Sequence, residues 1–345
     1  MVELEALAEA ALACGAPGVV VARREGGETV VGAAGAKDVE SGTRLDPTTQ
    51  FYVGSVGKTF LAALVLALVQ DQKLDLDEPA AAHLDGIGPI DEAVRVRDLL
   101  RHTSGLPDFY GEPRFLEALV EDPQRRWALD DLLELVLGAA DPPGTGWSYS
   151  NTNYVLLGLI VERVGGSPPA DQLRERIAEP LGLEGTQLGG GVSDMLARGY
   201  MPPDNPFLPA EQGLVDATEL GMSIPYLAPL VSTPADVARF LEALLDGTLL
   251  RPELRRELLA AVPADWDESE AYGLGIARIS SFYGTRASPC GHAWGHLGLA
   301  PGYTTIALSR EDGTRQVVLA ANIGLVAEEA WHPLADAAWA AFCGE

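Results

Sequence analysis

The chain has 345 residues, of which 47% are hydrophobic and 21% are charged, which indicates a globular protein with one large core or two lobes and excludes a disordered chain. It carries 50 acidic and 24 basic side chains, a formal net charge of −26, and such a surface repels phosphate backbones and anionic lipids. The longest apolar run, residues 60–69, is short of the roughly 20 residues that span a bilayer. We therefore expect no nucleic-acid partner and no membrane partner.

The sequence predicts one helix and two strands in the first part of the chain and mainly helices in the middle. A helix over residues 2–14 is predicted to precede two strands, 18–23 and 29–34, joined at a Gly-Gly turn. The middle of the chain has mainly helical periodicity. Its clearest helical segments are residues 60–70, 130–138, 154–164 and 234–245.

The C-terminal part again predicts strands, at 303–309 and 315–322, joined by a Glu-Asp-Gly-Thr turn and followed by a helix over 326–342. Strands at both ends predict an α+β fold, in which one antiparallel sheet is built from both chain ends and flanked by helices. The chain would form a single unit with two lobes. The predicted lobes are an α/β lobe, residues 1–58 with 262–345, and a mostly helical lobe, residues 59–261.

Cysteine usage and the N-terminus bear on the compartment. The three cysteines, Cys14, Cys290 and Cys343, form no CxxC motif, so we expect no disulfide framework. The first 15 residues are acidic and amphipathic, without the basic and apolar regions of a secretory signal. Both features predict a cytoplasmic protein.

The sharpest chemical feature is Ser55 followed three residues later by Lys58, at the start of an apolar helical segment. Residues i and i+3 share a helix face, so the amine can reach the hydroxyl, and burial would lower the pKa of the lysine and make it a base. Two other interpretations remain open. Ser55 could be a helix cap with Lys58 in solvent, or the segment could be a phosphate-binding loop, although Tyr52 occupies the position of that motif's first glycine.

Two further patterns lie on predicted loops and strands. Tyr149 and Asn151 precede a helix, where they could handle a proton and bind a carbonyl, or simply cap and pack. His296 and Gly298 precede a strand, and Gly298 would let a substrate backbone approach its edge. His292 and His296 have the spacing of a helical zinc pair, but the surrounding glycines disfavour a helix, so we expect no metal.

Taken together, these three patterns resemble the serine β-lactamase and penicillin-binding-protein superfamily, in the branch of class C β-lactamases, D-Ala-D-Ala carboxypeptidases and family VIII esterases. Further similar stretches are residues 99–108, 143–158, 179–183, 232–236 and 295–303. The resemblance implies the β-lactamase/transpeptidase-like fold, with no cofactor. It assigns His102, within the first of these stretches, to packing.

The resemblance also implies a role for each motif residue. Ser55 would be the acylated nucleophile, Lys58 its proton partner and Tyr149 the second proton-handling group. Asn151 would hold the substrate amide, and His296 to Gly298 would line the strand edge. The backbone N–H groups of Ser55 and Leu299 would form the oxyanion hole.

The third motif departs from the Lys-Thr-Gly of true β-lactamases, because His296 and Leu297 supply neither the lysine cation nor the hydroxyl. This argues against efficient β-lactam hydrolysis and predicts a hydrolase of esters or amides, as in esterases, amidases and D-amino-acid peptidases. The alternative is a transacylase that passes the acyl group of a small-molecule substrate to an amine or alcohol. Residues 189–229, with six prolines and three consecutive glycines, form a long loop that we expect to control water access. An inactive binding module on the same fold is the remaining alternative.

Overall fold

The structure is a computed structural model of the chain. It describes residues 2–88, 90–122, 124–136, 146–189, 191–203, 205, 213–220, 224–227, 229–266, 269–282, 284–325 and 327–344. Parts of the predicted loop over 189–229, part of the predicted helix over 130–138 and the first residue of the predicted C-terminal helix lie outside the described residues.

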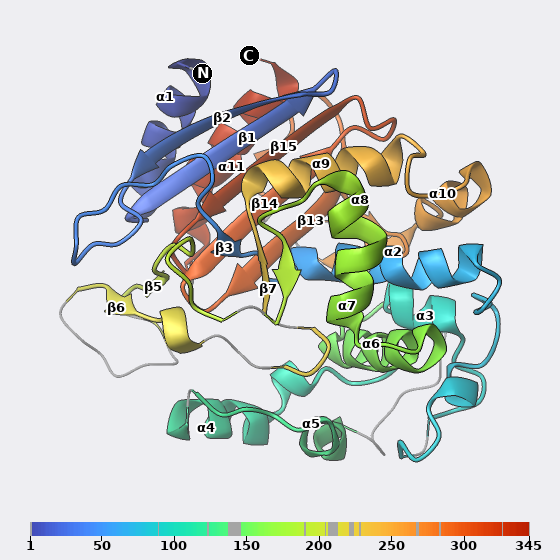
Figure 1. Cartoon of the computed structure of the whole chain (residues 1–345). Coiled ribbons are helices and arrows are strands. Elements are labelled where there is room, and N and C mark those ends of the chain that lie inside the picture. The colour runs from blue at the N-terminus through green and yellow to red at the C-terminus, as the bar shows by residue number, and fades with distance from the viewer. Residues whose placement is uncertain are drawn as a thin grey trace.

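An antiparallel eight-stranded sheet forms the centre of the molecule (Figure 1). Its order is β2-β1-β15-β14-β13-β10-β9-β8, so strands from both chain ends pair, with Val20 of β1 opposite Ala320 of β15. The predicted sheet is therefore confirmed. The strands are β1 (Gly18–Glu25), β2 (Glu28–Gly35), β8 (Val262–Trp266), β9 (Ser269–Tyr272), β10 (Ala277–Ile279), β13 (Ala293–Ala300), β14 (Tyr303–Ser309) and β15 (Arg315–Ala321).

Helices cover both faces of this sheet. Helices α1 (Val2–Ala11) and α11 (Glu328–Cys343) pack on one face, and α9 (Pro234–Leu245) and α2 (Val56–Gln70) pack on the other (Figure 1). Alternate residues of β15 point to opposite faces of the sheet. Val317 and Leu319 pack with α11 on one face, whereas Val318 packs with α2 and α9 on the other. Because both faces are covered, the strand is apolar from Val317 to Ala321 instead of alternating with polar residues.

The remaining α-helices belong to the middle of the chain, where α6 packs against α2, α3 and α7. They are α3 (Val96–Arg101), α4 (Pro113–Glu121), α5 (Leu129–Val136), α6 (Asn151–Gly165), α7 (Pro169–Leu173), α8 (Glu179–Leu181) and α10 (Pro252–Leu258). Shorter turns of helix are η1 (Leu12–Cys14), η2 (Ala80–His83), η3 (Phe109–Gly111), η4 (Arg174–Ala178) and η5 (Thr218–Leu220). Among the helices that the structure describes, none combines the length and apolar character needed to cross a bilayer.

Small sheets complete the fold and place the site. Strand β3 (Phe51–Tyr52) pairs with β7 (Leu230–Ser232), which pairs with β4 (Gln187–Leu188). Two more pairs are β5 (Tyr200–Met201) with β6 (Val215–Asp216), and β11 (Ser281–Phe282) with β12 (Arg286–Ala287). The division into two lobes stays a prediction, and α9, placed in the helical lobe by the sequence, packs against β1, β14 and β15.

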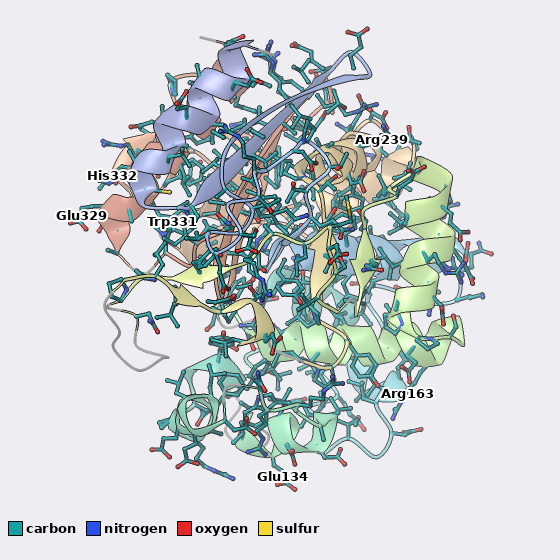
Figure 2. The ribbon with its side chains drawn as sticks, turned by 60° about the vertical axis from the view of Figure 1, so that its left-hand side comes forward. Glu134, Arg163, Arg239, Glu329, Trp331 and His332 are labelled. Atoms are coloured by element: carbon teal, nitrogen blue, oxygen red, sulfur yellow. A yellow bond between two sulfur atoms is a disulfide. The ribbon has the colours of Figure 1, made fainter. Side chains whose placement is uncertain are left out.

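One prediction about the cysteines is wrong: Cys290 and Cys343 form a disulfide, with Cα atoms 5.7 Å apart. They are 53 residues apart in sequence, and they meet because α11 packs across the sheet and ends beside the loop that leads into β13. Figure 2 shows Glu329 of this helix at the periphery of the molecule, whereas Trp331, two residues further on, is buried. The disulfide removes the cysteine argument for a reducing compartment.

Candidate active site

Ser55 lies at the turn between β3 and α2, directly before the first residue of the helix. Its backbone is helical (φ −65°, ψ −8°), and its side chain makes no capping hydrogen bond, so the hydroxyl is available for chemistry. Lys58 is only 1% exposed, and its Nζ lies 3.0 Å from Ser55 Oγ. The interpretation of Ser55 as a side-chain cap with a solvated lysine is therefore excluded by the geometry.

The surroundings of Lys58 favour the neutral amine. Burial lowers the pKa of Lys58 from 10.5 to about 7, and the negative charge of Asp108 only partly opposes this effect. The rings of Tyr149 and Tyr154 lie 4.9 and 5.6 Å from Nζ. A large fraction of the lysine is thus unprotonated near neutral pH, and its lone pair can accept the proton of Ser55.

Asn151, the first residue of α6, bonds to Lys58 and to a carboxylate that the sequence analysis did not single out. Lys58 Nζ donates to Asn151 Oδ1 at 2.7 Å. Asn151 Nδ2 donates to both carboxylate oxygens of Asp108, at 3.2 and 3.0 Å. The expectation that Asn151 holds a substrate amide stays a prediction, since its side chain is engaged with Lys58 and Asp108 in this structure.

Tyr149 lies in the segment that leads into α6, and His102 packs against it with ring centroids 4.4 Å apart. His102 is 1% exposed, and its Nδ1 accepts a hydrogen bond from the backbone N–H of Ser150 at 3.1 Å. Burial lowers the pKa of His102 well below its ordinary value, and the charges of Lys58 and His296 add to this effect. The neutral imidazole therefore packs, as expected, and also holds the backbone next to Tyr149.

His296, on β13, is buried, with 1% of its surface exposed. Its Nδ1 donates to the carbonyl of Leu297 at 2.6 Å, which leaves Nε2 to accept from the Tyr272 hydroxyl at 2.9 Å. Burial and the nearby Lys58 lower the pKa of His296 to about 3. The imidazole is therefore neutral at physiological pH. Because Ala293–Ala300 is a strand, His292 and His296 do not share the helical face of a zinc pair.

Glycines bring β13 against the Ser55 turn. A Cβ on Gly298 would stand 2.0 Å from the carbonyl oxygen of Val53. Gly54 has φ +53°, and a Cβ there would stand 2.5 Å from the carbonyl oxygen of Leu299. Gly298 thus permits a close approach of two segments of this chain, which is a different use from the substrate approach that the sequence suggests.

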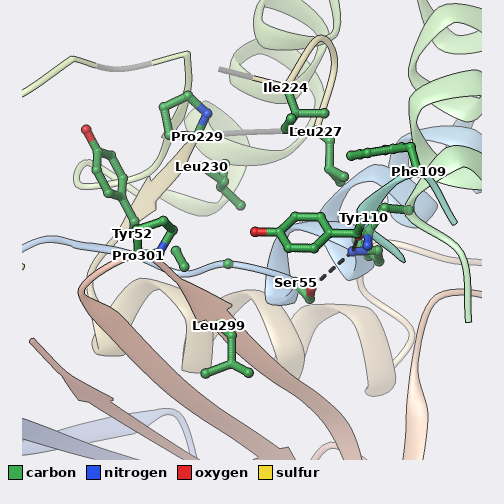
Figure 3. A pocket seen from close by; sticks show the side chains of 14 residues that line it. Tyr52, Ser55, Phe109, Tyr110, Ile224, Leu227, Pro229, Leu230, Leu299 and Pro301 are labelled. Atoms are coloured by element: carbon green, nitrogen blue, oxygen red, sulfur yellow. Dashed lines mark hydrogen bonds between the residues drawn. The ribbon is translucent and has the colours of Figure 1, made fainter. Parts of the chain in front are cut away.

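A pocket of about 200 Å³ opens beside Ser55 (Figure 3). Of the predicted site residues, Ser55, Lys58, Asn151 and Leu299 line it. Figure 3 shows Tyr110, Ile224 and Leu227 on one side of Ser55 and Leu299 on the other. The lining is otherwise mostly apolar: Tyr52, Gly54, Phe109, Tyr110, Ile224, Leu227, Pro229, Leu230, Ala300 and Pro301.

Sequence reasoning missed Asp108, which bonds to Asn151, and Tyr110, which lines the pocket. Asp108 accepts a hydrogen bond from the Tyr110 backbone N–H at 3.1 Å, and burial raises the pKa of the Asp108 carboxyl. Burial and the charge of Asp108 raise the pKa of the Tyr110 phenol. The available signal was an aspartate flanked by apolar residues, because a carboxylate in such a segment is rarely buried without partners.

Comparison with known proteins agrees with this fold. The chain matches the Beta-lactamase family over residues 4–336, and it therefore belongs to that family. It is 26% identical over 285 residues to the putative penicillin-binding protein PbpX of Bacillus subtilis (strain 168), covering 81% of this chain. The chain spans 63% of that relative's length.

Two solved structures superimpose over nearly the whole chain and confirm the β-lactamase/transpeptidase-like fold. A D-stereospecific amidohydrolase from Streptomyces sp. has a TM-score of 0.83 at 26% identity, over 100% of this chain and 99% of that one. A D-amino acid amidase from Ochrobactrum anthropi SV3, complexed with L-phenylalanine amide, has a TM-score of 0.83 at 29% identity, over 97% and 96%.

Proposed function

We propose that the protein is a serine hydrolase that cleaves amides or esters through an acyl-enzyme on Ser55. The observation that carries the proposal is the buried Lys58, whose Nζ lies 3.0 Å from Ser55 Oγ and whose pKa is lowered to about 7. A lysine in solvent would be protonated at neutral pH and could not act as a base. The N-terminal amides of α2 and their dipole further favour negative charge at this position.

The proposed reaction has two stages. In acylation, Ser55 Oγ bonds to the substrate carbonyl carbon while its proton passes to Lys58, and the C–N or C–O bond breaks as the leaving group takes up a proton. Tyr149, whose ring packs 4.9 Å from Lys58 Nζ, would deliver that proton. In deacylation, water attacks the acyl carbon and gives up a proton, the bond to Ser55 breaks as Ser55 Oγ takes up a proton, and a carboxylic acid leaves.

The oxyanion formed in each stage would lie between two segments that the glycines bring together. The backbone N–H of Ser55 is one proposed donor, and that of Leu299 is the other. Gly54 faces the backbone of Leu299 closely enough that a Cβ would stand 2.6 Å from the Leu299 nitrogen. This contact supports a fixed spacing between the two proposed donors.

The pocket supports an uncharged, apolar substrate. Among the described lining residues Lys58 is the one basic side chain, and the neutral His296 supplies no charge for a substrate carboxylate. Strand β10 pairs with β13 over Ala293–Gly295, whereas β14 pairs with it through Ala300, so the outer edge near Leu299 faces the pocket. An amide with an apolar acyl group fits this lining, and the names of the two structural neighbours support amide substrates.

Acyl transfer to an amine or alcohol remains the second candidate, because it shares every step up to the acyl-enzyme. Ile224, Leu227 and Pro229, from the described part of the long loop, place apolar side chains beside Ser55. Such a wall disfavours water and would allow an apolar acceptor to compete with it. We propose that this loop sets the balance between hydrolysis and transfer.

Intact-protein mass spectrometry tests the proposal. The protein and its Ser55→Ala variant are incubated with a fluorophosphonate and with short-chain p-nitrophenyl esters, and product acid is measured with and without an added amine. We expect one adduct that is absent from the variant. Because we propose that water is the main acceptor, we expect more product acid than amide even when the amine is present. A folded protein with no adduct would overturn the proposal, and a product dominated by the amide would favour the transacylase.

A further inference from the structure

The orientation of the Asn151 side chain is determined by its partners. A carboxylate only accepts hydrogen bonds, so the two contacts between Asn151 and Asp108 require the Asn151 NH₂ group to face Asp108. Asn151 Oδ1 is then turned toward Lys58 Nζ, 2.7 Å away. Asp108 also accepts from the Asn151 backbone N–H at 3.1 Å, which fixes this residue at the start of α6.

We infer that Asp108 is a positioning residue for the proposed reaction, acting through Asn151 to hold the Lys58 amine against Ser55. This inference rests on the proposed role of Lys58 as the base. With Asn151 Oδ1 accepting one of its hydrogens, the neutral amine keeps its lone pair directed at the Ser55 hydroxyl. Without the carboxylate, the amide is free to flip and place its NH₂ group against the amine, so that two donors would meet.

Asp108 also acts on Lys58 through its charge. Among the described residues, it is the carboxylate whose charge raises the pKa of Lys58 against the effect of burial. The other titratable groups near Nζ are His102, directly after α3, Tyr149 and Tyr154, before and within α6, and His296 on β13. Tyr110, on η3, lies near the Asp108 carboxylate. The two imidazoles are held neutral by burial, so they do not replace the charge of Asp108.

The small number of lysines allows the protonation of Lys58 to be measured directly. The sequence contains three lysines, Lys37, Lys58 and Lys73, so protein labelled with ¹³C at lysine Cε gives three side-chain signals. The signal that disappears in Lys58→Met belongs to Lys58, and the other two are internal references. Titrating this signal from pH 5 to 11 reports the protonation of Lys58 without any need for a substrate.

The decisive variant is Asp108→Asn, which keeps the size of the side chain and an oxygen for the Tyr110 and Asn151 backbone N–H groups. Losing the charge and flipping Asn151 both disfavour the ammonium, so we expect the Lys58 midpoint to fall by about one pH unit or more below that of the wild type. kcat should fall about tenfold or more with little change in KM, because a displaced base affects the chemical step. Asp108→Glu, which keeps the carboxylate, should recover part of both properties.

The matched control is Asp91→Asn. Asp91 is exposed and also accepts a hydrogen bond from the backbone N–H two residues further on, as Asp108 does, and this control should leave the Lys58 titration unchanged. If Lys58 titrates near 7 in both the wild type and Asp108→Asn, the role of Asp108 is refuted while the proposed base stands. If Lys58 of the wild type titrates near 10, the proposed function itself fails. A fall in kcat without a change in the titration would show that Asp108 acts only as a structural cap.

Discussion

Replacing Lys58 with methionine should make the protein more stable while abolishing its activity. Methionine has a similar length and no amine, so it fills the same buried space beside Ser55 without a charge to desolvate. Lys58 is 1% exposed, and burial holds its pKa near 7. The wild type therefore bears a free-energy cost for burying this lysine that the variant does not.

The size of the effect follows from the pKa. A decrease from 10.5 to about 7, at about 1.4 kcal/mol per pH unit, corresponds to at most about 5 kcal/mol of destabilisation at or below pH 7. Methionine also leaves the Asn151 carbonyl oxygen without its donor, which costs about 1–3 kcal/mol. We therefore expect Lys58→Met to raise the free energy of unfolding by about 2–4 kcal/mol at pH 7.

The difference in the free energy of unfolding between the wild type and Lys58→Met should depend on pH. Between pH 7 and 10.5 the unfolded chain holds one more proton on Lys58 than the folded chain, so wild-type stability rises with pH relative to the variant. The advantage of Lys58→Met should be greatest at pH 7 and below. Above pH 10.5 the cost of burying the ammonium is gone, and the unpaired Asn151 carbonyl oxygen should leave the variant less stable than the wild type by about 1–3 kcal/mol.

Urea unfolding at several pH values, with the disulfide intact, measures this difference. The exposed Lys73, replaced in the same way by Lys73→Met, is the matched control and should show no such pH-dependent difference. A Lys58→Met protein that is less stable than the wild type at pH 7, or a difference independent of pH, would refute the account of the buried base.

Three further substitutions test other parts of the structure. Gly298→Ala places a Cβ 2.0 Å from the Val53 carbonyl oxygen, which should displace the Ser55 turn. We expect the free energy of unfolding in urea to fall by about 1–3 kcal/mol and kcat to fall about 100-fold. Wild-type kinetics would contradict the close approach. Cys290→Ser opens a covalent loop of about 50 residues, so it should lower the free energy of unfolding by about 2–4 kcal/mol and leave kcat almost unchanged. An unaltered urea midpoint would contradict a stabilising role of the disulfide. Tyr149→Phe should reduce kcat by about 100-fold or more while the urea midpoint stays close to that of the wild type, and full activity would remove Tyr149 from the proton path.

Much of the sheet could be predicted from the sequence, because local patterns determine it. The apolar run in β15 and the turn before it predict a strand, and the structure confirms this strand and packs helices on both of its faces. Short strands such as β11 and β12 were not predicted. Two-residue strands have too little periodicity to detect, and tertiary contacts determine them.

The site was predictable where chemistry depends on local spacing. Ser55 and Lys58 are three residues apart on one helix, so their contact follows from the sequence pattern. The partners of Asn151 and His296 were not predictable in this way. Asp108 lies 43 residues before Asn151, and Tyr272 lies 24 residues before His296, so only the folded chain shows that these pairs share hydrogen bonds.

The cysteines show the same limit. Neither Cys290 nor Cys343 lies in a local motif, and their disulfide depends on where α11 ends relative to the loop before β13. An odd number of cysteines and the absence of a CxxC motif therefore gave a wrong prediction about disulfide bonding. The cytoplasmic location inferred from the same residues stays a prediction.

The central claim is that a neutral Lys58 activates Ser55. The most direct measurement is the second-order rate of Ser55 modification by a fluorophosphonate as a function of pH, with the modified peptide identified by mass spectrometry. We expect the rate to rise with pH through a midpoint near 7, the pKa of Lys58, and to collapse in Lys58→Met. A midpoint near 10, or modification at an unchanged rate in Lys58→Met, would contradict the claim.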